Sequence, residues 1–345
     1  MINSLVYLTR RCPRKCDYCR LRDSNLQGPE LNKWEWVRAF KVLQNLEVDF
    51  NLILGNETWL LGGDLLHIMC ENKIPFALYT TCPETLFEKY REIYFNSGVI
   101  DNLSCGIDYP YSYLLNVLKE RGSFNNDMEL KSFTAWKGLI WTRANYPTVD
   151  CQGTVTVSKE NYRLLPNTVE ELTNFGIFCG INFIHWDKKG FDFFPSEEEM
   201  KLFLMGEGDV LDLEYCISKI GKNYIQNFEM LKEDVHLLTS MGWHCGGNPY
   251  GGPTVDSDGS LRCCGYRTGS RTKNFSIFDL EDVTNIPLWR EAVYLDCKEC
   301  PGCFWSYPWM YHYWLNSNDE FGKKVFVNHA GKHISSERWS KRRLE

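Results

Sequence analysis

Short apolar runs alternate with amphipathic stretches along the first half of the chain. The runs have the length of buried strands, and the stretches between them repeat apolar side chains every three or four positions, as amphipathic helices do. In residues 31–46, for example, Trp36, Phe40 and Leu43 share one helical face. The pattern predicts strands at 5–8, 51–54, 76–81, 102–107, 154–157 and 181–185, and helices at 31–46, around Leu61–Ile68, at 84–94, at 130–144, and from a capping box at Thr168–Glu171 to Gly176.

Six strand–helix units predict an α/β fold for residues 1–190. Strands that alternate with helices form a parallel sheet with right-handed crossovers. Six units suit an open, partial (β/α)6 barrel rather than a closed eight-stranded one.

The rest of the chain changes in character and predicts separate parts. Residues 191–241 lose the alternation and become helical and acidic, which predicts a helical connection. Residues 242–330 are rich in Gly, Cys and aromatic side chains, and Thr254–Arg262 has the Asp-Gly turn of a β-hairpin. We expect a small Cys-rich domain there, followed by a basic tail at 331–345.

Composition excludes several classes of protein. The net charge of −7 argues against nucleic acid as a partner. No apolar run reaches the length of a membrane span, and the start lacks the segments of a signal peptide. We therefore expect a cytoplasmic protein with no membrane partner. Disulfides are not expected in that compartment, so the clustering of the 15 cysteines points to metal.

The first cysteine group, Cys12, Cys16 and Cys19, follows the first predicted strand. Three thiols at spacings of four and three residues can close on one face of an iron–sulfur cube and leave its fourth iron open. A zinc knuckle is the alternative. Zinc takes a fourth protein ligand close by, and no Cys or His follows before His67.

This C-x3-C-x2-C spacing after a first strand, with an aromatic residue before the last Cys, resembles the radical S-adenosylmethionine (radical SAM) enzymes. The resemblance implies that the three cysteines hold a 4Fe–4S cluster whose open iron binds the amine and carboxylate of SAM, with Tyr18 near the adenine. It implies reductive cleavage of SAM to a 5′-deoxyadenosyl radical that takes hydrogen from a substrate carbon. It also implies an external one-electron donor of the flavodoxin or ferredoxin type, and the partial barrel.

Polar residues at other strand ends extend the resemblance. Gly55, Asn56 and Glu57 stand where the family commonly has Gly-Gly-Glu-Pro, which meets the methionyl amine of SAM; Asn56 and Thr58 depart from that pattern. Asp108, Ser158 and Asn161 fall where the family binds the methionine carboxylate and the ribose. Taken singly, such residues are also ordinary turn or cap residues. His185, at the end of the sixth strand, is equally a substrate contact or an ordinary hydrogen-bonded residue.

The second cysteine group lies in the predicted C-terminal domain. Thirteen residues separate Cys245 from Gly259 and four separate Gly259 from Cys264; Cys297, Cys300 and Cys303 follow. The arrangement resembles the SPASM and twitch extensions of radical SAM enzymes, which carry auxiliary 4Fe–4S clusters. Since no Cys follows Cys303, we expect one twitch-type cluster on Cys245, Cys264, Cys297 and Cys300, with Cys263 or Cys303 as substitutes or neighbours. A zinc ribbon on the same thiols is the alternative.

The resemblance implies an oxidoreductase that modifies or cross-links a ribosomal peptide. Dehydrogenation or epimerisation of a small, aminocyclitol-like molecule is the next interpretation, and modification of a nucleotide base the third. A non-catalytic iron–sulfur or zinc binding module is the alternative from another class. Only eleven residues precede Cys12, so a leader-binding domain is expected to be absent or on another chain.

Overall fold

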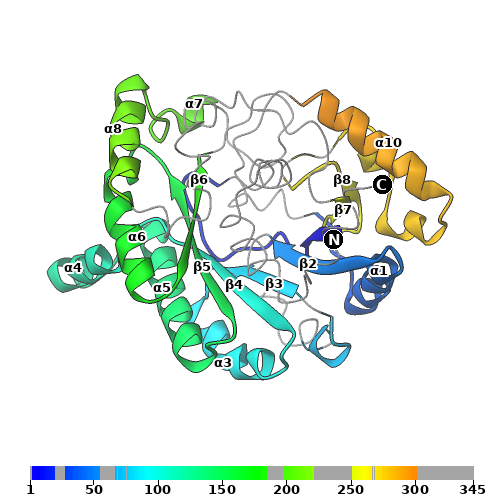
Figure 1. Ribbon diagram of the computed structural model, residues 1–345, viewed down its shortest axis with the longest axis horizontal. Helices are drawn as coiled ribbons and strands as arrows, with labels where there is room; N and C mark the ends of the chain where they lie inside the picture. Colours follow the sequence, from blue (N-terminus) through cyan, green and yellow to red (C-terminus); the bar gives the residue numbers. More distant parts are fainter. Residues whose placement is uncertain are drawn as a thin grey trace.

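In the part of the chain that the structure describes, eight strands form one sheet in the order β6-β5-β4-β3-β2-β1-β7-β8, with helices around its outer side (Figure 1). The structure, a computed structural model, describes residues 2–19, 28–54, 67, 69–74, 76–184, 197–220, 251–265, 267 and 269–300. All neighbours pair in parallel except β7 and β8, which are antiparallel. The strands are β1 Ile2–Tyr7, β2 Val48–Leu54, β3 Phe76–Thr80, β4 Ile100–Gly106, β5 Asp150–Val157, β6 Phe178–Phe183, β7 Gly251–Val255 and β8 Leu261–Arg262.

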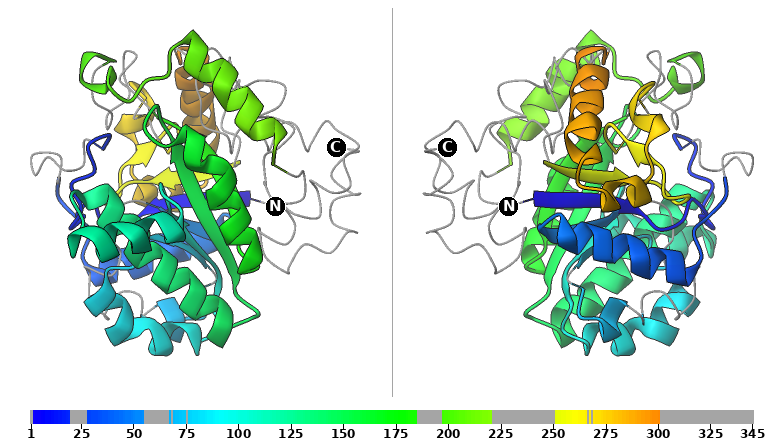
Figure 2. Two further views of the ribbon diagram at one scale, coloured as in Figure 1. Left: turned by 90° about the vertical axis from the view of Figure 1, so that its left-hand side faces the viewer. Right: turned by 90° about the vertical axis from the view of Figure 1, so that its right-hand side faces the viewer.

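The strand pattern confirms a mixed α/β fold with a parallel sheet. Figure 2 shows the sheet curving, with the helices that follow its strands on the convex side. The predicted hairpin is also present: β7 and β8 pair, and Gly259 takes the left-handed φ of 82° that the turn requires. This hairpin continues the parallel sheet, because β7 pairs directly with β1.

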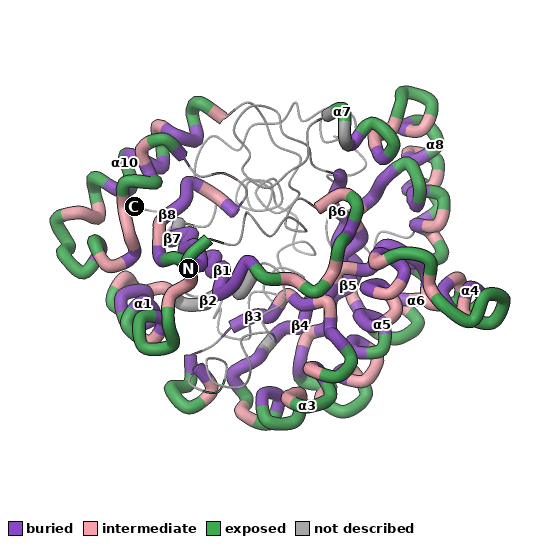
Figure 3. Tube along the Cα trace, turned by 180° about the vertical axis from the view of Figure 1, so that it is seen from behind, coloured by how far each residue is buried: buried purple, intermediate pink, exposed green. Residues whose placement is uncertain are grey.

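Each of the longer helices buries apolar side chains, some against the sheet and others against a neighbouring helix or 3-10 turn. The strands appear buried and the outer turns of the helices exposed in Figure 3. None of the helices in the described part of the chain is long and apolar enough to cross a membrane. The helices are α1 Lys33–Asn45, α3 Glu84–Phe95, α4 Tyr111–Arg121, α5 Asp127–Asn145, α6 Leu165–Asn174, α7 Glu197–Met200, α8 Glu207–Ser218 and α10 Asn285–Lys298.

One local prediction needs correction, and one helix was not predicted. The predicted capping box at Thr168 is wrong, since α6 begins at Leu165 with a proline in its first turn, and the Thr168 hydroxyl donates to the Leu164 carbonyl. Glu171 instead accepts hydrogen bonds from the Tyr111 and Ser112 backbone N–H groups at the start of α4. Helix α4 itself was not predicted. The helix expected around Leu61–Ile68 lies largely outside the described residues.

Candidate functional site

The loop with the first three cysteines leaves the carboxyl end of β1. Cys16 is buried, Cys12 and Cys19 are half-buried, and the Cys19 backbone N–H donates to the Cys16 carbonyl at 2.9 Å. Burial raises the pKa of the Cys16 thiol to about 11. Within the ranges that the structure describes, no three His, Cys, Asp or Glu side chains are grouped so as to hold a metal ion. The donor chemistry nevertheless fits a 4Fe–4S cluster, because such clusters take thiolates as their protein ligands.

A buried trio of polar side chains adjoins this loop. The Tyr18 hydroxyl donates to Asp108 Oδ2 at 2.9 Å, and Lys131 Nζ donates to the same carboxylate oxygen at 2.5 Å. Lys131 Nζ also contacts the Tyr18 oxygen. The side chains of Lys131 and Asp108 are 6% and 0% exposed. A residue of the cysteine loop is thereby bonded to a desolvated ion pair.

Three elements bring this trio together. Asp108 lies two residues beyond β4, and its backbone N–H donates to Ser132 Oγ at 2.9 Å. Ser132 and Lys131 are in α5, whose N-terminus is capped by the Asn126 side chain. A Cβ at Gly106 would lie only 3.2 Å from Lys131 Nζ, so the glycine leaves room for the lysine.

The trio combines a desolvated ion pair with one unpaired carboxylate oxygen. Burial acts to lower the pKa of Lys131, but Asp108, Tyr18 and Cys16 together outweigh it, Asp108 contributing most, and hold that pKa well above its usual value. Lysine is therefore charged there. Asp108 Oδ1 is buried and has no hydrogen-bond partner. This oxygen fits a bound hydrogen-bond donor, because burying a carboxylate oxygen unpaired is costly.

Lys131 is the functional candidate that sequence reasoning missed. A lysine near a helix start is ordinarily solvated, and no motif surrounds Lys131. The one sequence signal is its position three residues after Met128 and four before Ala135, both buried, where it interrupts the apolar stripe of α5. A cation on a buried stripe needs a counter-charge, which here is Asp108.

Ser158 and Asn161, which follow β5, form a hydrogen-bonded turn next to Asp108. Asn161 Oδ1 accepts from the Ser158 backbone N–H at 2.8 Å, and its Nδ2 donates to the carbonyls of Asp108 and Thr156. Both side chains are buried. Asn161 thus joins the ends of β4 and β5, and the two residues shape the rim next to the trio. Gly55, Asn56, Glu57 and His185 lie outside the described residues.

The second cysteine group is partly described. Cys263 and Cys264 follow β8, Cys297 is in α10 and Cys300 is just beyond it. A hydrogen bond with Cys264 acts to lower the pKa of the Cys263 thiol, but contact with Cys297 and burial outweigh it and raise it. The Cys263 thiol therefore contacts both Cys264 and Cys297, although the described thiols form no group that could hold a metal ion. Cys245 and Cys303 lie outside the described residues.

One buried aspartate organises this second region. Asp296, next to Cys297, accepts from the Thr272 backbone N–H and hydroxyl at 2.8 Å and from Arg271 Nη1 at 3.1 Å. Burial acts to raise the pKa of Asp296, but these hydrogen bonds outweigh it and leave the pKa lowered. A Cβ at Gly269 would collide with the Asp296 carboxylate. The segment after Cys264 is thereby fixed onto α10.

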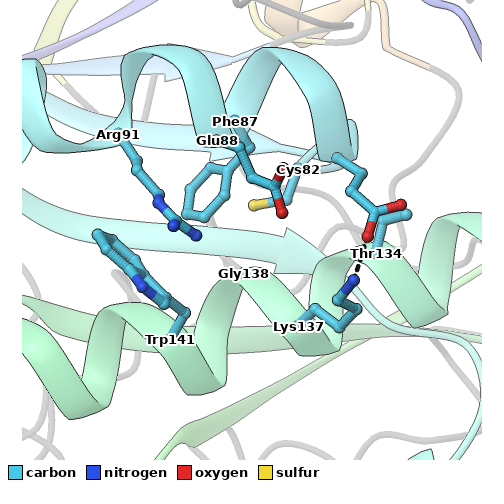
Figure 4. Close-up of a pocket in the computed structure, with 9 residues that line it drawn as sticks. Cys82, Phe87, Glu88, Arg91, Thr134, Lys137, Gly138 and Trp141 are labelled. Carbon is cyan, nitrogen blue, oxygen red and sulfur yellow. Dashed lines mark hydrogen bonds and ion pairs between the residues drawn. The ribbon is translucent and has the colours of Figure 1, made fainter.

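A groove of about 100 Å³ lies between α3 and α5 (Figure 4), and Arg14 of the first cysteine loop donates to Thr134 at its lining. The Arg91 guanidinium stacks 4.0 Å from the Trp141 ring centroid, and Lys137 pairs with Glu84. Cys82 lies at the groove, with its sulfur 3.5 Å from that of Cys105. None of the residues predicted for the site lines this groove.

Comparison with known proteins relates the fold to one group of solved structures. No protein-family model and no curated protein sequence matches the chain. The structure of SuiB from Streptococcus suis bound to precursor peptide SuiA matches with a TM-score of 0.56 at 14% identity, over 87% of this chain and 67% of that chain. SuiB bound to S-adenosylmethionine matches with a TM-score of 0.50 at 14% identity, over 75% and 59%. A further SuiB structure matches with a TM-score of 0.56 at 15% identity, over 85% and 66%.

These matches define a shared fold. The present chain spans between 59% and 67% of the length of the SuiB chains that it matches. The architecture is therefore that of SuiB, an α/β fold with a parallel sheet.

Proposed function

We propose that this chain is a radical SAM enzyme in which Cys12, Cys16 and Cys19 hold a 4Fe–4S cluster. The observation that carries the proposal is the bonding of Tyr18, inside the cysteine loop, to the buried Asp108–Lys131 pair. A zinc knuckle needs no such pair beside it. A site for a zwitterionic cofactor does, because it must match both charges of an amino-acid group.

The charges of Lys131 and Asp108 decide which part of SAM each of the two would bind. A carboxylate repels another carboxylate, so Lys131, and not Asp108, has the charge to bind the methionine carboxylate. Asp108 Oδ1, which is buried without a partner, would accept from the ammonium or from a ribose hydroxyl. Leaving such an acceptor unpaired costs about 1–3 kcal/mol, which a bound donor would recover. Glu57 stays the predicted partner of the methionyl ammonium, with Gly55 and Asn56 as backbone contacts, while Ser158 and Asn161 hold the rim.

The site residues bind, orient and shield the cofactor. The bound cluster would supply the electron that cleaves SAM to a radical able to take hydrogen from an unactivated carbon. The trio, which is desolvated, would fix the amino-acid end of SAM and keep water from it. The electron itself would come from an external donor of the flavodoxin or ferredoxin type.

We assign a ribosomal peptide as the substrate class. The similarity in fold to SuiB, one structure of which holds a precursor peptide, supports this choice over a small molecule. An auxiliary 4Fe–4S cluster on Cys245, Cys264, Cys297 and Cys300, with Cys303 nearby, would favour a net oxidation or a cross-link. The contacts of the Cys263 thiol with Cys264 and Cys297 bring two of the chain segments of this cysteine group together.

The test is SAM cleavage by the anaerobically reconstituted full chain. With dithionite as the reductant, we expect 5′-deoxyadenosine from the native chain and none from the Cys16→Ala variant. About eight irons per chain are expected if both clusters form. Tightly bound zinc in place of iron, or no 5′-deoxyadenosine from iron-loaded protein, would contradict the proposal.

A further inference from the structure

The first cysteine loop has a neck, formed where the chain leaves β1 and where it returns before α1. Glu30, on the returning side, accepts from the Thr9 hydroxyl at 2.5 Å and from the Arg10 backbone N–H at 3.3 Å. It also pairs with the Arg11 guanidinium at 2.9 Å. One carboxylate thus holds the two sides of the neck together.

The turn of the β7–β8 hairpin binds both sides of this neck. Arg10 Nε donates to Asp256 Oδ1 at 2.7 Å, and a second nitrogen of the same guanidinium contacts Asp256 Oδ2. On the returning side, the Leu31 backbone N–H donates to the Ser257 carbonyl at 2.7 Å. The Leu31 side chain packs so closely on the turn that a Cβ at Gly259 would lie 3.2 Å from it. A segment near residue 256 therefore fixes the base of a loop that begins near residue 11.

Asp256 also reaches the second cysteine group. Arg262 Nη1 donates to Asp256 Oδ2 at 2.9 Å, and the Arg262 side chain is fully buried. Arg262 Nε then donates to the Cys264 carbonyl at 3.4 Å. Arg10 precedes Cys12 by two residues, and Arg262 precedes Cys264 by two. One carboxylate therefore lies between the chain segments that lead into the two cysteine groups.

The surroundings make this arrangement rigid. The guanidinium carbons of Arg10 and Arg262 each lie 5.8 Å from the centroid of the Tyr7 ring, and the Tyr7 hydroxyl donates to the Gly265 carbonyl. Asp256 and Arg10 are both 6% exposed. Paired charges in such a desolvated place hold one geometry, because any other leaves a charge uncompensated.

We propose that Asp256 is a positioning residue for the first cysteine loop, which it fixes through Arg10 and ties through Arg262 to the segment of Cys264. That the loop holds a cluster rests on the proposed function. That Asp256 fixes the conformation of the loop does not. Asp256 touches neither cysteine group, and acts through the two arginines that precede them. The order of residues 12–19 is thus set by the C-terminal hairpin as well as by β1.

The experiment is hydrogen exchange on the metal-free full chain, read by mass spectrometry. Asp256→Asn keeps the shape of the side chain and removes its charge. We expect exchange at residues 12–19 to rise at least tenfold, with strands β3 to β5 unchanged, and Asp256→Glu to restore much of the protection. The matched control is Glu281→Gln, which breaks an exposed bidentate pair with Arg38 that also joins the two halves of the chain. Exchange at 12–19 should stay as in the native chain.

A milder variant keeps the proposal testable if Asp256→Asn does not fold. Arg10→Lys retains the charge and loses the second hydrogen bond, and should raise exchange at 12–19 about threefold or more. Exchange at 12–19 within twofold of the native value in the folded variants would overturn the proposal. So would an equal rise across β3 to β5, which would mean general destabilisation.

A second arm separates this proposal from the proposed function. After reconstitution with ferrous iron and sulfide, the reduced native chain should give an electron paramagnetic resonance signal that changes on adding SAM. Asp256→Asn should weaken that response to SAM, and Asp256→Glu should restore it. A native chain with no such signal would contradict the proposed function, while the exchange result would still decide the role of Asp256.

Discussion

The two cysteine groups each lie beside a fully buried aspartate, and the two aspartates differ in their hydrogen bonds. Asp108, near Cys16, has one oxygen bonded to Lys131 and Tyr18 and the other without a partner. Asp296, next to Cys297, has both oxygens occupied by the 270–272 segment. A buried carboxylate oxygen that accepts no hydrogen bond indicates a ligand site. A buried carboxylate whose oxygens both accept hydrogen bonds from the protein indicates a structural role. Asp108 thus has an acceptor open to a ligand, whereas Asp296 joins the 270–272 segment to α10.

The largest expected effect comes from removing the thiols themselves. Replacing Cys12, Cys16 and Cys19 together by Ala should leave about half of roughly eight irons per chain and abolish SAM cleavage.

Replacing Cys264 and Cys300 together should also remove about half of the iron, retain SAM cleavage and abolish product formation. Iron analysis and 5′-deoxyadenosine assays measure the two outcomes. Full product yield from the second variant would show that its cluster has no part in turnover.

Lys131→Met tests the charged trio. It leaves the Asp108 carboxylate buried without its counter-charge, so we expect the free energy of unfolding to fall by about 3–5 kcal/mol. The control is Lys137→Met on the same helix, which breaks the exposed pair with Glu84 and should cost at most about 1 kcal/mol. Urea denaturation of the metal-free chain measures both. Equal losses of unfolding free energy in the two variants would show that the Asp108–Lys131 pair contributes no more to stability than an exposed ion pair.

Asp296→Asn tests the structural role of Asp296. Because the hydrogen bonds to this carboxylate are charge-assisted, we expect a loss of about 1.5–3 kcal/mol in the free energy of unfolding. The affinity for SAM, measured by calorimetry on the reconstituted chain, should stay within about twofold. A tenfold loss of SAM affinity at unchanged stability would show that Asp296 serves binding instead.

The smallest effect concerns the buried thiols that belong to neither group. A Cβ at Gly138 would lie 2.5 Å from Cys82 Sγ, so Gly138→Ala should cost about 1–3 kcal/mol through overpacking. Adding Cys82→Ala should recover part of that loss, because the smaller side chain removes the clash. Denaturation of the two variants decides this. No recovery in the double variant would mean that the thiol is not what Gly138 accommodates.

Sequence pattern predicted the parts of the fold that depend on local periodicity. The buried strands and helix α1 follow from it, because each buries a regular face. Helix α4 was missed since it buries only Leu114 and Val117, too few to repeat visibly. The start of α6 was misplaced because Glu171 serves another helix, a contact that no local pattern reveals.

The residues of the candidate site also divide into those that the sequence predicted and those that depend on tertiary contacts. The cysteine spacing pointed directly to Cys12, Cys16 and Cys19, and strand ends pointed to Asp108. Lys131 depends on how α5 crosses β4, and Asp256 on the pairing of β7 with β1. Both are tertiary facts, so the spacing of residues along the chain could not supply them.

The position of β1 between β2 and β7 also has a consequence for synthesis on the ribosome. One edge of β1 pairs with β2 early, but its other partner begins at Gly251. At about 5–20 residues per second, translation leaves that edge uncovered for roughly 10–50 s. Unpaired strand edges recruit other chains. A nascent sheet that waits this long for β7 is exposed to aggregation, and abundant chaperone during synthesis should increase the yield of folded protein.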